Sequence, residues 1–291
     1  MSLMVTRRQL IGAGIGCSVA MAAPAWAYSS LAHELEALEH SLDVTLGLWA
    51  LDTGTGKIVS YRAGERFAFC STFKVVLAAA ILAKSADDRG LLDRRITYSE
   101  DQLVVYSPVT EKHVGDGMTV SALCAATLQY SDNTAGNILL EQVGGPVGLT
   151  AFARNLGDPA FRLDRNEPEL NTALPDDPRD TTTPLAMGMT LQKLLLGNSL
   201  AEAGRLQLQE WLKGNTTGDK RIRAGVPQGW VVGDKTGSGD YGVANDVAVI
   251  WPPGKAPWIL VVFTRGQQKA SSWSNEAISS SARAVVKSLG Q

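Results

Sequence analysis

The chain has 291 residues, 45% of them hydrophobic and 19% charged, so it can bury a substantial core as one large domain or two modest ones. Its formal net charge of -2 and its lack of any run of like charge argue against binding to nucleic acid or to an anionic membrane. The histidines, His33, His40 and His113, lack the spacing of metal ligands, which argues against a metallo-hydrolase, and we expect no cofactor.

The first 27 residues have the features of an export signal. Residues 6–11 (TRRQLI) form a twin-arginine pattern, a short apolar run follows, and residues 25–27 (AWA) form a small-x-small cleavage site. The run is broken by Pro24 and is shorter than the roughly 20 residues that span a bilayer. A lipoprotein signal at Cys17 is a minor alternative. We therefore predict twin-arginine export to the periplasm or the outside, with no membrane partner after processing.

Hydrophobic periodicity predicts the remaining elements in chain order. An amphipathic helix at 30–41 precedes strands at 44–52 and 58–62, which a Thr53-Gly54-Thr55-Gly56 turn joins as a hairpin. The middle of the chain is mostly helical, with helices predicted at 74–84, 120–130, 135–143, 147–156, 184–196 and 200–212. Strands return at 230–234, 242–251 and 258–264, and a helix at 276–289 closes the chain.

The two ends of the mature chain are predicted to form one domain. An isolated two-stranded hairpin is marginal in water, so the early strands need the late ones to complete a sheet. We therefore predict a discontinuous α/β domain from residues 28–66 and 218–291, with both terminal helices on one face of an antiparallel sheet. Residues 67–217 form an inserted all-α domain, and a cleft lies at the boundary. The fold class is α+β.

A serine and a lysine three residues apart, Ser71 and Lys74, open an apolar helix. Residues three apart on a helix share a face, so Lys74 can reach the Ser71 hydroxyl. The helix start adds free backbone N–H groups and a positive dipole end, which suit an oxyanion in acyl transfer. Alone, the pair is better explained by a capping serine and a solvated lysine, because the pattern arises by chance about once in a chain of this size.

Two further motifs follow along the chain. Ser131-Asp132-Asn133 lies in a turn between two predicted helices, where a hydroxyl can pass a proton to a leaving nitrogen and Asn133 can bind a substrate amide. Lys235-Thr236-Gly237 ends a predicted strand, where glycine permits close approach of a ligand. Each motif alone favours a helix cap or a strand end, but three motifs in this order favour an acyl-transfer site.

Together these motifs resemble those of the class A serine β-lactamases, over essentially the whole mature sequence. Residues 167–171 (EPELN) are similar to the E-x-x-L-N motif of that family and lie in a long segment without periodicity, residues 162–180. By resemblance this segment is the omega loop, braced by an ion pair between Arg165 and Asp180. The family holds the bond after the glutamate in the cis form, and here the next residue is Pro168, so we predict a cis bond.

The resemblance implies a role for each site residue. Ser71 attacks the lactam carbonyl, its proton passes to Lys74 or through a water to Glu167, and Ser131 protonates the departing nitrogen. Lys235 keeps the pocket electropositive, the backbone N–H groups of Ser71 and Ser238 form the oxyanion hole, and Glu167 with Asn171 activates the deacylating water. The other implied contacts are the substrate carboxylate with Thr236, Ser238 and Arg221, the side-chain amide with Asn133, and a cleft wall at Tyr106.

This chain departs from the family pattern in ways that bear on substrates. Many members carry an arginine on the strand after the Lys-Thr-Gly motif, but residues 243–245 read VAN, so Arg221 resembles the arginine that replaces it in one subgroup. Gly239 stands where the carbapenem-hydrolysing subgroup has the disulfide partner of Cys70. We therefore expect penicillins and cephalosporins as substrates, with carbapenems poor, and free buried thiols at Cys70 and Cys124.

Two other classes of protein share part of this site. A β-lactam receptor or sensor domain, and a cell-wall transpeptidase or carboxypeptidase, would both keep Ser71, Lys74, Ser131 and Lys235. Neither resembles this chain at Glu167 and Asn171. A Ser-His-Asp hydrolase is excluded because the G-x-S-x-G elbow is missing around Ser71. We expect a hydrolase that confers antibiotic resistance, and a monomer by default.

Overall fold

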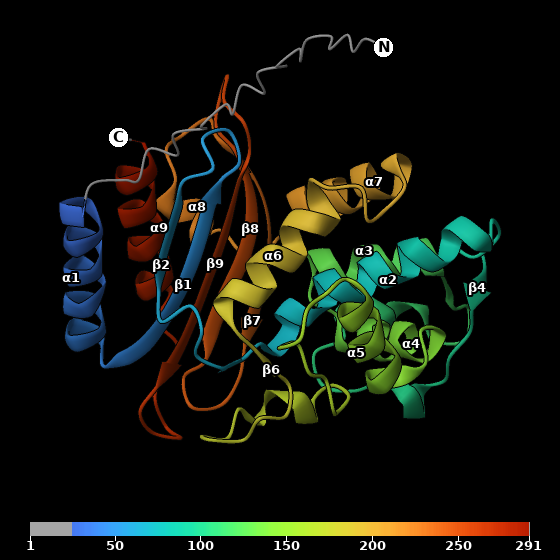
Figure 1. Ribbon diagram of the computed structural model, residues 1–291. Coiled ribbons are helices and arrows are strands. Elements are labelled where there is room, and N and C mark those ends of the chain that lie inside the picture. Colours follow the sequence, from blue (N-terminus) through green and yellow to red (C-terminus); the bar gives the residue numbers. More distant parts are fainter. Residues whose placement is uncertain (1–24, 291) are drawn as a thin grey trace, which may run out of the picture.

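The structure, a computed structural model, describes residues 25–290 (Figure 1). Its strands are β1 (Val44–Asp52), β2 (Ile58–Tyr61), β3 (Phe67–Ala68), β4 (Arg95–Ile96), β5 (Met118–Thr119), β6 (Thr181–Thr182), β7 (Val231–Ser238), β8 (Ala244–Trp251) and β9 (Trp258–Gly266). Its α-helices are α1 (Ala25–Leu42), α2 (Lys74–Asp87), α3 (Val120–Gln129), α4 (Asn133–Gln142), α5 (Gly145–Asn155), α6 (Pro184–Leu195), α7 (Glu202–Lys213), α8 (Ile222–Gly225) and α9 (Asn275–Leu289). The predicted α+β class is confirmed.

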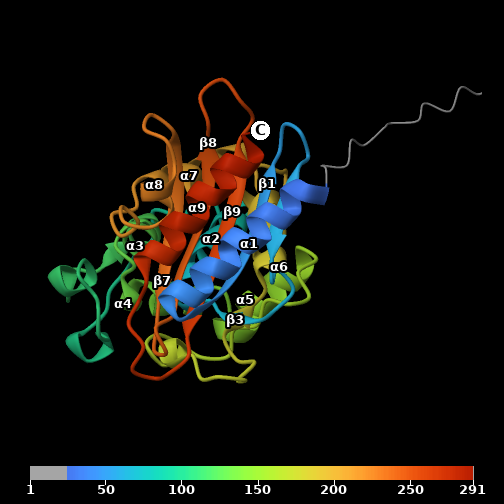
Figure 2. The same cartoon turned by 90° about the vertical axis from the view of Figure 1, so that its left-hand side faces the viewer.

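Both ends of the chain contribute strands to one antiparallel sheet, in the order β2-β1-β9-β8-β7. Strand β9 has apolar residues on both faces: Leu260 and Val262 pack in one core, and Ile259 and Val261 pack in the other. Helices α1 and α9 lie side by side over the first face, and the helical lobe lies on the opposite side (Figures 1 and 2). Strand β7 forms one edge of the sheet. This edge contacts the part of the helical lobe that carries Ser71.

Helix α2 runs through the centre of the helical lobe. All residues from Lys74 to Leu82 are buried, and helices α3, α4, α5 and α7 pack around it. A helix that is apolar on every side is stable only when it is enclosed in this way. It is preceded by a 3₁₀ turn, Cys70–Phe73, which packs against β7 and carries Ser71. The packing therefore fixes the predicted nucleophile between the two lobes.

The structure differs from the sequence prediction at several boundaries. Strand β7 was predicted to end at Asp234, but it pairs with β8 as far as Ser238. Helix α2 begins at Lys74, so Ser71 lies in the preceding 3₁₀ turn. The short helix α8 and the two-stranded pairs β3–β6 and β4–β5 were not predicted. Most of the predicted signal, residues 1–24, lies outside the described residues; of the helices that are described, none has the length and apolar character to cross a membrane.

Gly188 allows helix α6 to lie against the sheet. A Cβ atom at this position would lie 2.1 Å from a ring carbon of Trp49 on strand β1. We expect Gly188→Ala to lower the free energy of unfolding by about 2–3 kcal/mol, because the core must shift to accept the methyl group. Urea unfolding followed by circular dichroism measures the change.

Gly204→Ala is the matched control for this prediction. Gly204 also lies in a helix, α7, but the nearest atom to its added Cβ would be 3.6 Å away, an ordinary contact. Alanine favours helix by up to about 1 kcal/mol over glycine, so this variant should be as stable as the parent or more so. Equal losses from the two substitutions would contradict the packing argument.

Candidate active site

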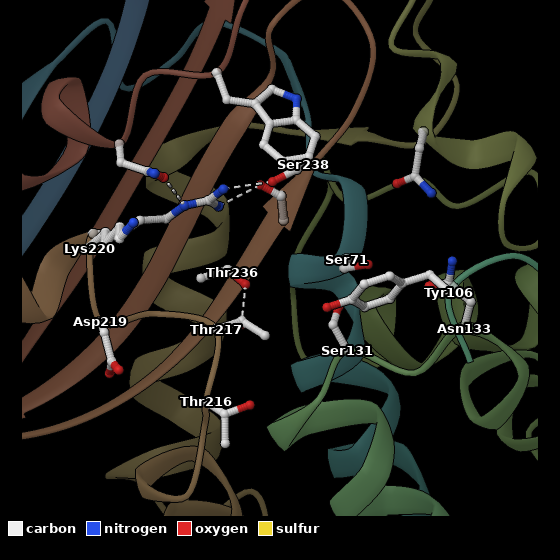
Figure 3. A pocket seen from close by; sticks show the side chains of 15 residues that line it. Ser71, Tyr106, Ser131, Asn133, Thr216, Thr217, Asp219, Lys220, Thr236 and Ser238 are labelled. Atoms are coloured by element: carbon white, nitrogen blue, oxygen red, sulfur yellow. Dashed lines mark hydrogen bonds between the residues drawn. The ribbon is translucent and has the colours of Figure 1, made fainter. Parts of the chain in front are cut away.

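A cavity of about 610 Å³ opens between the helical lobe and strand β7 (Figure 3). Figure 3 shows Ser71 between two sets of side chains, with Thr236 and Ser238 on the strand side and Tyr106, Ser131 and Asn133 on the other. The predicted site residues that line the cavity are Ser71, Tyr106, Ser131, Asn133, Asn171, Arg221, Thr236 and Ser238. The other three, Lys74, Glu167 and Lys235, are buried behind this surface and contact its residues.

The Ser71 hydroxyl points at the omega loop. Its Oγ donates a hydrogen bond of 2.9 Å to Oε1 of Glu167, and both side chains are buried. Gly237 on β7 lies directly behind the 3₁₀ turn, because a Cβ at this glycine would be 3.1 Å from the Ser71 nitrogen. Ser71, the predicted nucleophile, is thus held between a carboxylate and the edge of the sheet.

Lys74 makes three polar contacts. Its Nζ lies 2.9 Å from Oε1 of Glu167, and it donates hydrogen bonds to the Ser131 carbonyl at 2.8 Å and to Oδ1 of Asn133 at 2.7 Å. An ammonium group has three protons, so these contacts match its full donor capacity. The spacing predicted that Lys74 would reach Ser71; the structure instead links the two through the shared Glu167 carboxylate.

Two asparagines hold Glu167 in place, one through its backbone and the other through its carboxylate. Asn137 on helix α4 accepts from the Glu167 N–H at 2.9 Å and donates to the Glu167 carbonyl at 2.8 Å. Asn171 donates its side-chain N–H to Oε2 of Glu167. The predicted cis bond between Glu167 and Pro168 is confirmed.

The omega loop is braced from outside the cavity. Arg165 Nε lies 2.5 Å from Oδ2 of Asp180, which confirms the predicted ion pair. Asp180 also accepts from the backbone N–H groups of Asp164 and Arg165, at 2.8 and 3.0 Å. The buried Asp180 carboxylate therefore closes the two ends of the loop on each other.

Ser131 lies between two lysines. Its backbone has φ 59°, a left-handed conformation that a turn imposes, and its carbonyl accepts from Lys74. Its hydroxyl accepts from Nζ of Lys235 at 3.0 Å, and Lys235 also donates to the Thr236 carbonyl at 2.8 Å. One buried lysine thus holds the carbonyl of Ser131, and the other holds its hydroxyl.

Burial lowers the pKa of Lys74, and the neighbouring Glu167 carboxylate opposes this shift. Burial also lowers the pKa of Lys235 well below its usual range; the charge of Lys74 adds to the shift, and that of Asp234 opposes it. Both lysines are buried behind the cavity surface, so each depends on a neighbouring carboxylate, Glu167 or Asp234, to keep its charge.

Arg221 is almost fully buried beneath β7. It donates to the carbonyls of Gly237 at 2.8 Å and Asn245 at 2.7 Å, and its Nη2 donates to Oγ of Ser238 at 2.6 Å. Nε donates to Oδ1 of Asn275 at 2.9 Å. The structure therefore brings together Arg221 and Ser238, two of the residues that the resemblance assigned to the substrate carboxylate.

Asn133 and Tyr106 are joined through their backbones. The Asn133 N–H donates to the Tyr106 carbonyl at 3.0 Å, and the Asn133 side chain donates to the carbonyl of Val105 at 2.9 Å. Since Oδ1 of Asn133 accepts from Lys74, this amide is partly engaged by the protein itself. Tyr106 is 57% exposed and forms part of the cavity wall.

The site combines a serine hydroxyl, a buried carboxylate and two buried lysines, and no histidine lines its cavity. Across the described residues, 25–290, no group of three or more metal-ligating side chains converges. A model of the family described as "Beta-lactamase enzyme family" matches residues 30–289. The chain belongs to this family.

Relatives of this β-lactamase confirm the predicted class. This chain is 58% identical over 245 residues to Beta-lactamase CTX-M-97 of Escherichia coli. It is 54% identical over 254 residues to a Klebsiella oxytoca protein named Carbapenem-hydrolyzing beta-lactamase KPC. These matches cover 84% and 87% of both chains, respectively.

Two solved structures have a comparable sequence identity to this chain. A β-lactamase from Desulfarculus baarsii superposes with a TM-score of 0.89 at 57% identity, covering 91% of this chain and 98% of that one. A variant of the last common ancestor of Gram-negative class A β-lactamases superposes with a TM-score of 0.86 at 55% identity, covering 88% and 97%. The protein is a class A serine β-lactamase, and therefore a hydrolase.

Several residues of this β-lactamase site were not predicted. Asn137 lies four residues after Asn133 on α4, so a search for helix neighbours of the motif finds it. Thr217 contacts the Thr236 hydroxyl at 2.5 Å, and Asn275 orients Arg221. Trp273 lines the cavity, and its position in a Ser-rich stretch after a strand gives no signal in the sequence.

Among the described residues of the β-lactamase, Cys70 and Cys124 are free and buried, as predicted. Burial is the main cause that raises the pKa of both Cys70 and Cys124, so neither is a reactive thiolate. A Cβ added at Gly239 would lie 2.7 Å from Sγ of Cys70. The two positions are therefore adjacent, but only one of them carries sulfur.

Proposed function

We propose that the protein hydrolyses the β-lactam amide bond of penicillins and cephalosporins through an ester on Ser71, and thereby gives antibiotic resistance. The observation that carries this proposal is the buried contact of 2.9 Å between the Ser71 hydroxyl and the Glu167 carboxylate. A receptor that keeps its acyl group needs no carboxylate there. A hydrolase needs one to activate water.

In the first half of the reaction, Ser71 Oγ bonds to the lactam carbonyl carbon and the C–N bond breaks. Glu167 is the proposed acceptor of the Ser71 proton, because it already accepts that hydrogen bond while the three contacts of Lys74 use its donor capacity. Ser131 gives its proton to the departing nitrogen, and its contact with Lys235 supports this role, since a nearby cation stabilises the transient alkoxide. The proton on Glu167 then passes by way of Lys74 to the Ser131 oxygen, so the Glu167 carboxylate is restored before the second half.

The oxyanion site is proposed at the backbone N–H groups of Ser71 and Ser238. Both residues line the cavity, and Gly237 brings the strand against the 3₁₀ turn that carries Ser71. Fixed backbone donors aimed at a developing negative charge supply a large part of catalysis in acyl transfer.

In the second half, a water molecule attacks the ester carbonyl and Glu167 takes a proton from it. Glu167 then gives that proton to Ser71 Oγ as the ester C–O bond breaks. Asn171 supports this step, because its Nδ2 donates to Glu167 while its Oδ1 is buried without a hydrogen-bond partner among the described residues. Buried polar atoms are rarely left unpaired, so this oxygen is a suitable site for the attacking water.

The substrate carboxylate is proposed to bind Thr236 and Ser238, with Arg221 behind them. Arg221 already donates to the Ser238 hydroxyl, which leaves that hydroxyl free to donate its own proton to a carboxylate. Asn133 would donate to the side-chain amide through the N–H that it does not give to Val105. Asn171 lies close to Asn133, because Lys74 contacts both Asn133 and the Glu167 carboxylate, to which Asn171 donates.

The expected substrate range is that of the broad cephalosporin-hydrolysing members, with carbapenems poor. Cys70 and Gly239 support this, because the position beside the thiol carries no cysteine and the disulfide of the carbapenem-hydrolysing subgroup cannot form. We further propose twin-arginine export to the periplasm or the outside, a monomeric enzyme, and the two-domain division at residues 66–67 and 217–218.

Turnover of a chromogenic cephalosporin, benzylpenicillin and imipenem by the purified mature protein tests this function. We expect catalytic hydrolysis of the first two and poor hydrolysis of imipenem. Ser71→Ala should abolish all turnover and all covalent labelling. Capture of one penicillin per molecule without release would identify a receptor instead, and efficient imipenem turnover would contradict the proposed substrate range.

A further inference from the structure

Two exposed aromatic side chains line the active-site cavity from opposite lobes. Tyr106 precedes helix α3 in the helical lobe and is 57% exposed, and Trp273 lies between β9 and α9 and is 60% exposed. Large aromatic rings are usually buried, and an exposed ring in a concave site offers a large contact area to a ligand. Tyr106 was predicted as a cleft wall, whereas Trp273 has no role in the mechanism derived above.

The indole of Trp273 is held at one place in the cavity wall. Its Nε1 donates to the carbonyl of Gly239 at 3.2 Å. The next two residues are also fixed, because Ser274 caps helix α9 and Asn275 accepts from Arg221. A ring that is held in advance loses little conformational entropy when a ligand binds to it.

Gly239 places the indole near the omega loop. A Cβ on this glycine would lie 2.6 Å from the Asn171 carbonyl, and the next residue, Asp240, donates its N–H to that carbonyl at 2.9 Å. Trp273 therefore borders the end of the cavity where Asn171 lies. This is the end proposed above for the acyl side chain of the substrate.

Tyr106 is fixed on the opposite side. Its φ of 67° is unusual for a bulky residue, and the hydrogen bond from the Asn133 N–H to its carbonyl holds it there. Figure 3 shows its ring beside Ser131, across the cavity from Ser238. Tyr106 and Trp273 therefore line the same cavity, one from the helical lobe and the other from the segment that follows β9.

We propose that Trp273 is a specificity-determining residue which, opposite Tyr106, binds a flat aromatic group on the acyl side chain of the β-lactam. The inference rests on the proposed function and adds the substrate class to it. A single aromatic contact changes affinity by roughly two- to tenfold. Because the group lies away from the reacting bond, the effect falls on KM more than on kcat.

Benzylpenicillin and 6-aminopenicillanic acid test the proposal, because they share one nucleus and only the first has a phenylacetyl group. We expect Trp273→Ala to lower kcat/KM for benzylpenicillin about three- to tenfold, mainly through KM, and to change that for 6-aminopenicillanic acid less than about twofold. Trp273→Phe should restore most of the loss, because it keeps a flat ring without the indole N–H.

Two controls separate this contact from a structural effect. Leu206→Ala removes an exposed apolar side chain on helix α7, outside the cavity. This variant should have the same kcat/KM as the parent for both penicillins. Equilibrium binding in a Ser71→Ala background should show the same loss of affinity from Trp273→Ala for benzylpenicillin alone. Equal losses for both penicillins, or no loss for either, would overturn the inference while the proposed function stands. If the parent protein hydrolyses neither penicillin, the proposed function itself fails.

Discussion

Glu167→Ala protein mixed with benzylpenicillin is expected to gain the mass of one penicillin and to keep it. The alanine cannot take a proton from water, so release of the ester should slow by about 10²- to 10⁴-fold. Intact-protein mass spectrometry at successive times measures the ester, and peptide mapping should place it on Ser71.

Formation of the ester should survive the same substitution. The Glu167 carboxylate opposes the burial effect that lowers the pKa of Lys74, so its removal lowers that pKa further. A neutral Lys74 amine can then accept the Ser71 proton in place of the carboxylate. Acylation slows, but less than deacylation, and the ester accumulates.

Glu169→Ala is the matched control. Glu169 lies two residues along the same loop and carries the same charge, but it is exposed to solvent. This variant should turn over penicillin at nearly the rate of the parent. Continued rapid turnover by Glu167→Ala would refute the mechanism, whereas loss of activity in both variants would indicate a disturbed loop.

The residues of this site differ in how far the sequence predicts them. The spacing of Ser71 and Lys74 predicted that both lie on one face at the start of a helix. The order of the motifs then predicted the other residues of the site. Sequence spacing cannot give the contacts of Lys74 with Ser131 and Asn133, 57 and 59 positions away, because they depend on how α2 packs against the next helices. The prediction of a direct link from Lys74 to Ser71 therefore missed the shared carboxylate.

The length of strand β7 shows a second limit of the sequence. Asp234, Lys235 and Thr236 are polar, so the run of apolar residues that indicates a strand does not extend through them. In the structure the ladder with β8 continues to Ser238, because Lys235 donates to Ser131 and the hydroxyl of Thr236 contacts that of Thr217. Polar residues that are paired inside a protein have no periodic signature. Such residues are found through the motif rather than through the pattern.

The same neighbourhood contains a buried carboxylate that the mechanism does not use. Asp246 on β8 is fully buried; Oδ2 accepts from the Ile222 N–H at 3.0 Å, and Oδ1 has no hydrogen-bond partner among the described residues. Burial raises the pKa of Asp246 well above its usual range, and the charge of Asp234 adds to the shift, although Arg221 opposes it. Asp234 is better able to stay charged, since Arg223 and Asn215 donate to it at 2.6 and 2.5 Å. We therefore expect Asp246 to hold a proton in the folded protein.

Asp246→Asn should consequently stabilise the enzyme more as the pH rises. A group with a raised pKa in the folded state contributes its full stability below the unfolded pKa and loses it as the pH increases toward the folded pKa. Asparagine does not titrate, so the free energy of unfolding of the variant should gain on that of the parent by about 1.4 kcal/mol per pH unit from about pH 4 upward. Urea unfolding of both proteins at intervals of one pH unit measures the slope.

Asp93→Asn, which alters an exposed carboxylate, is the control, and its stability difference from the parent should be nearly constant over the same pH range. A flat difference for Asp246→Asn, or a falling one, would mean that the carboxylate is ionised in the fold, and Lys235 and Arg221 would then face two negative charges instead of one.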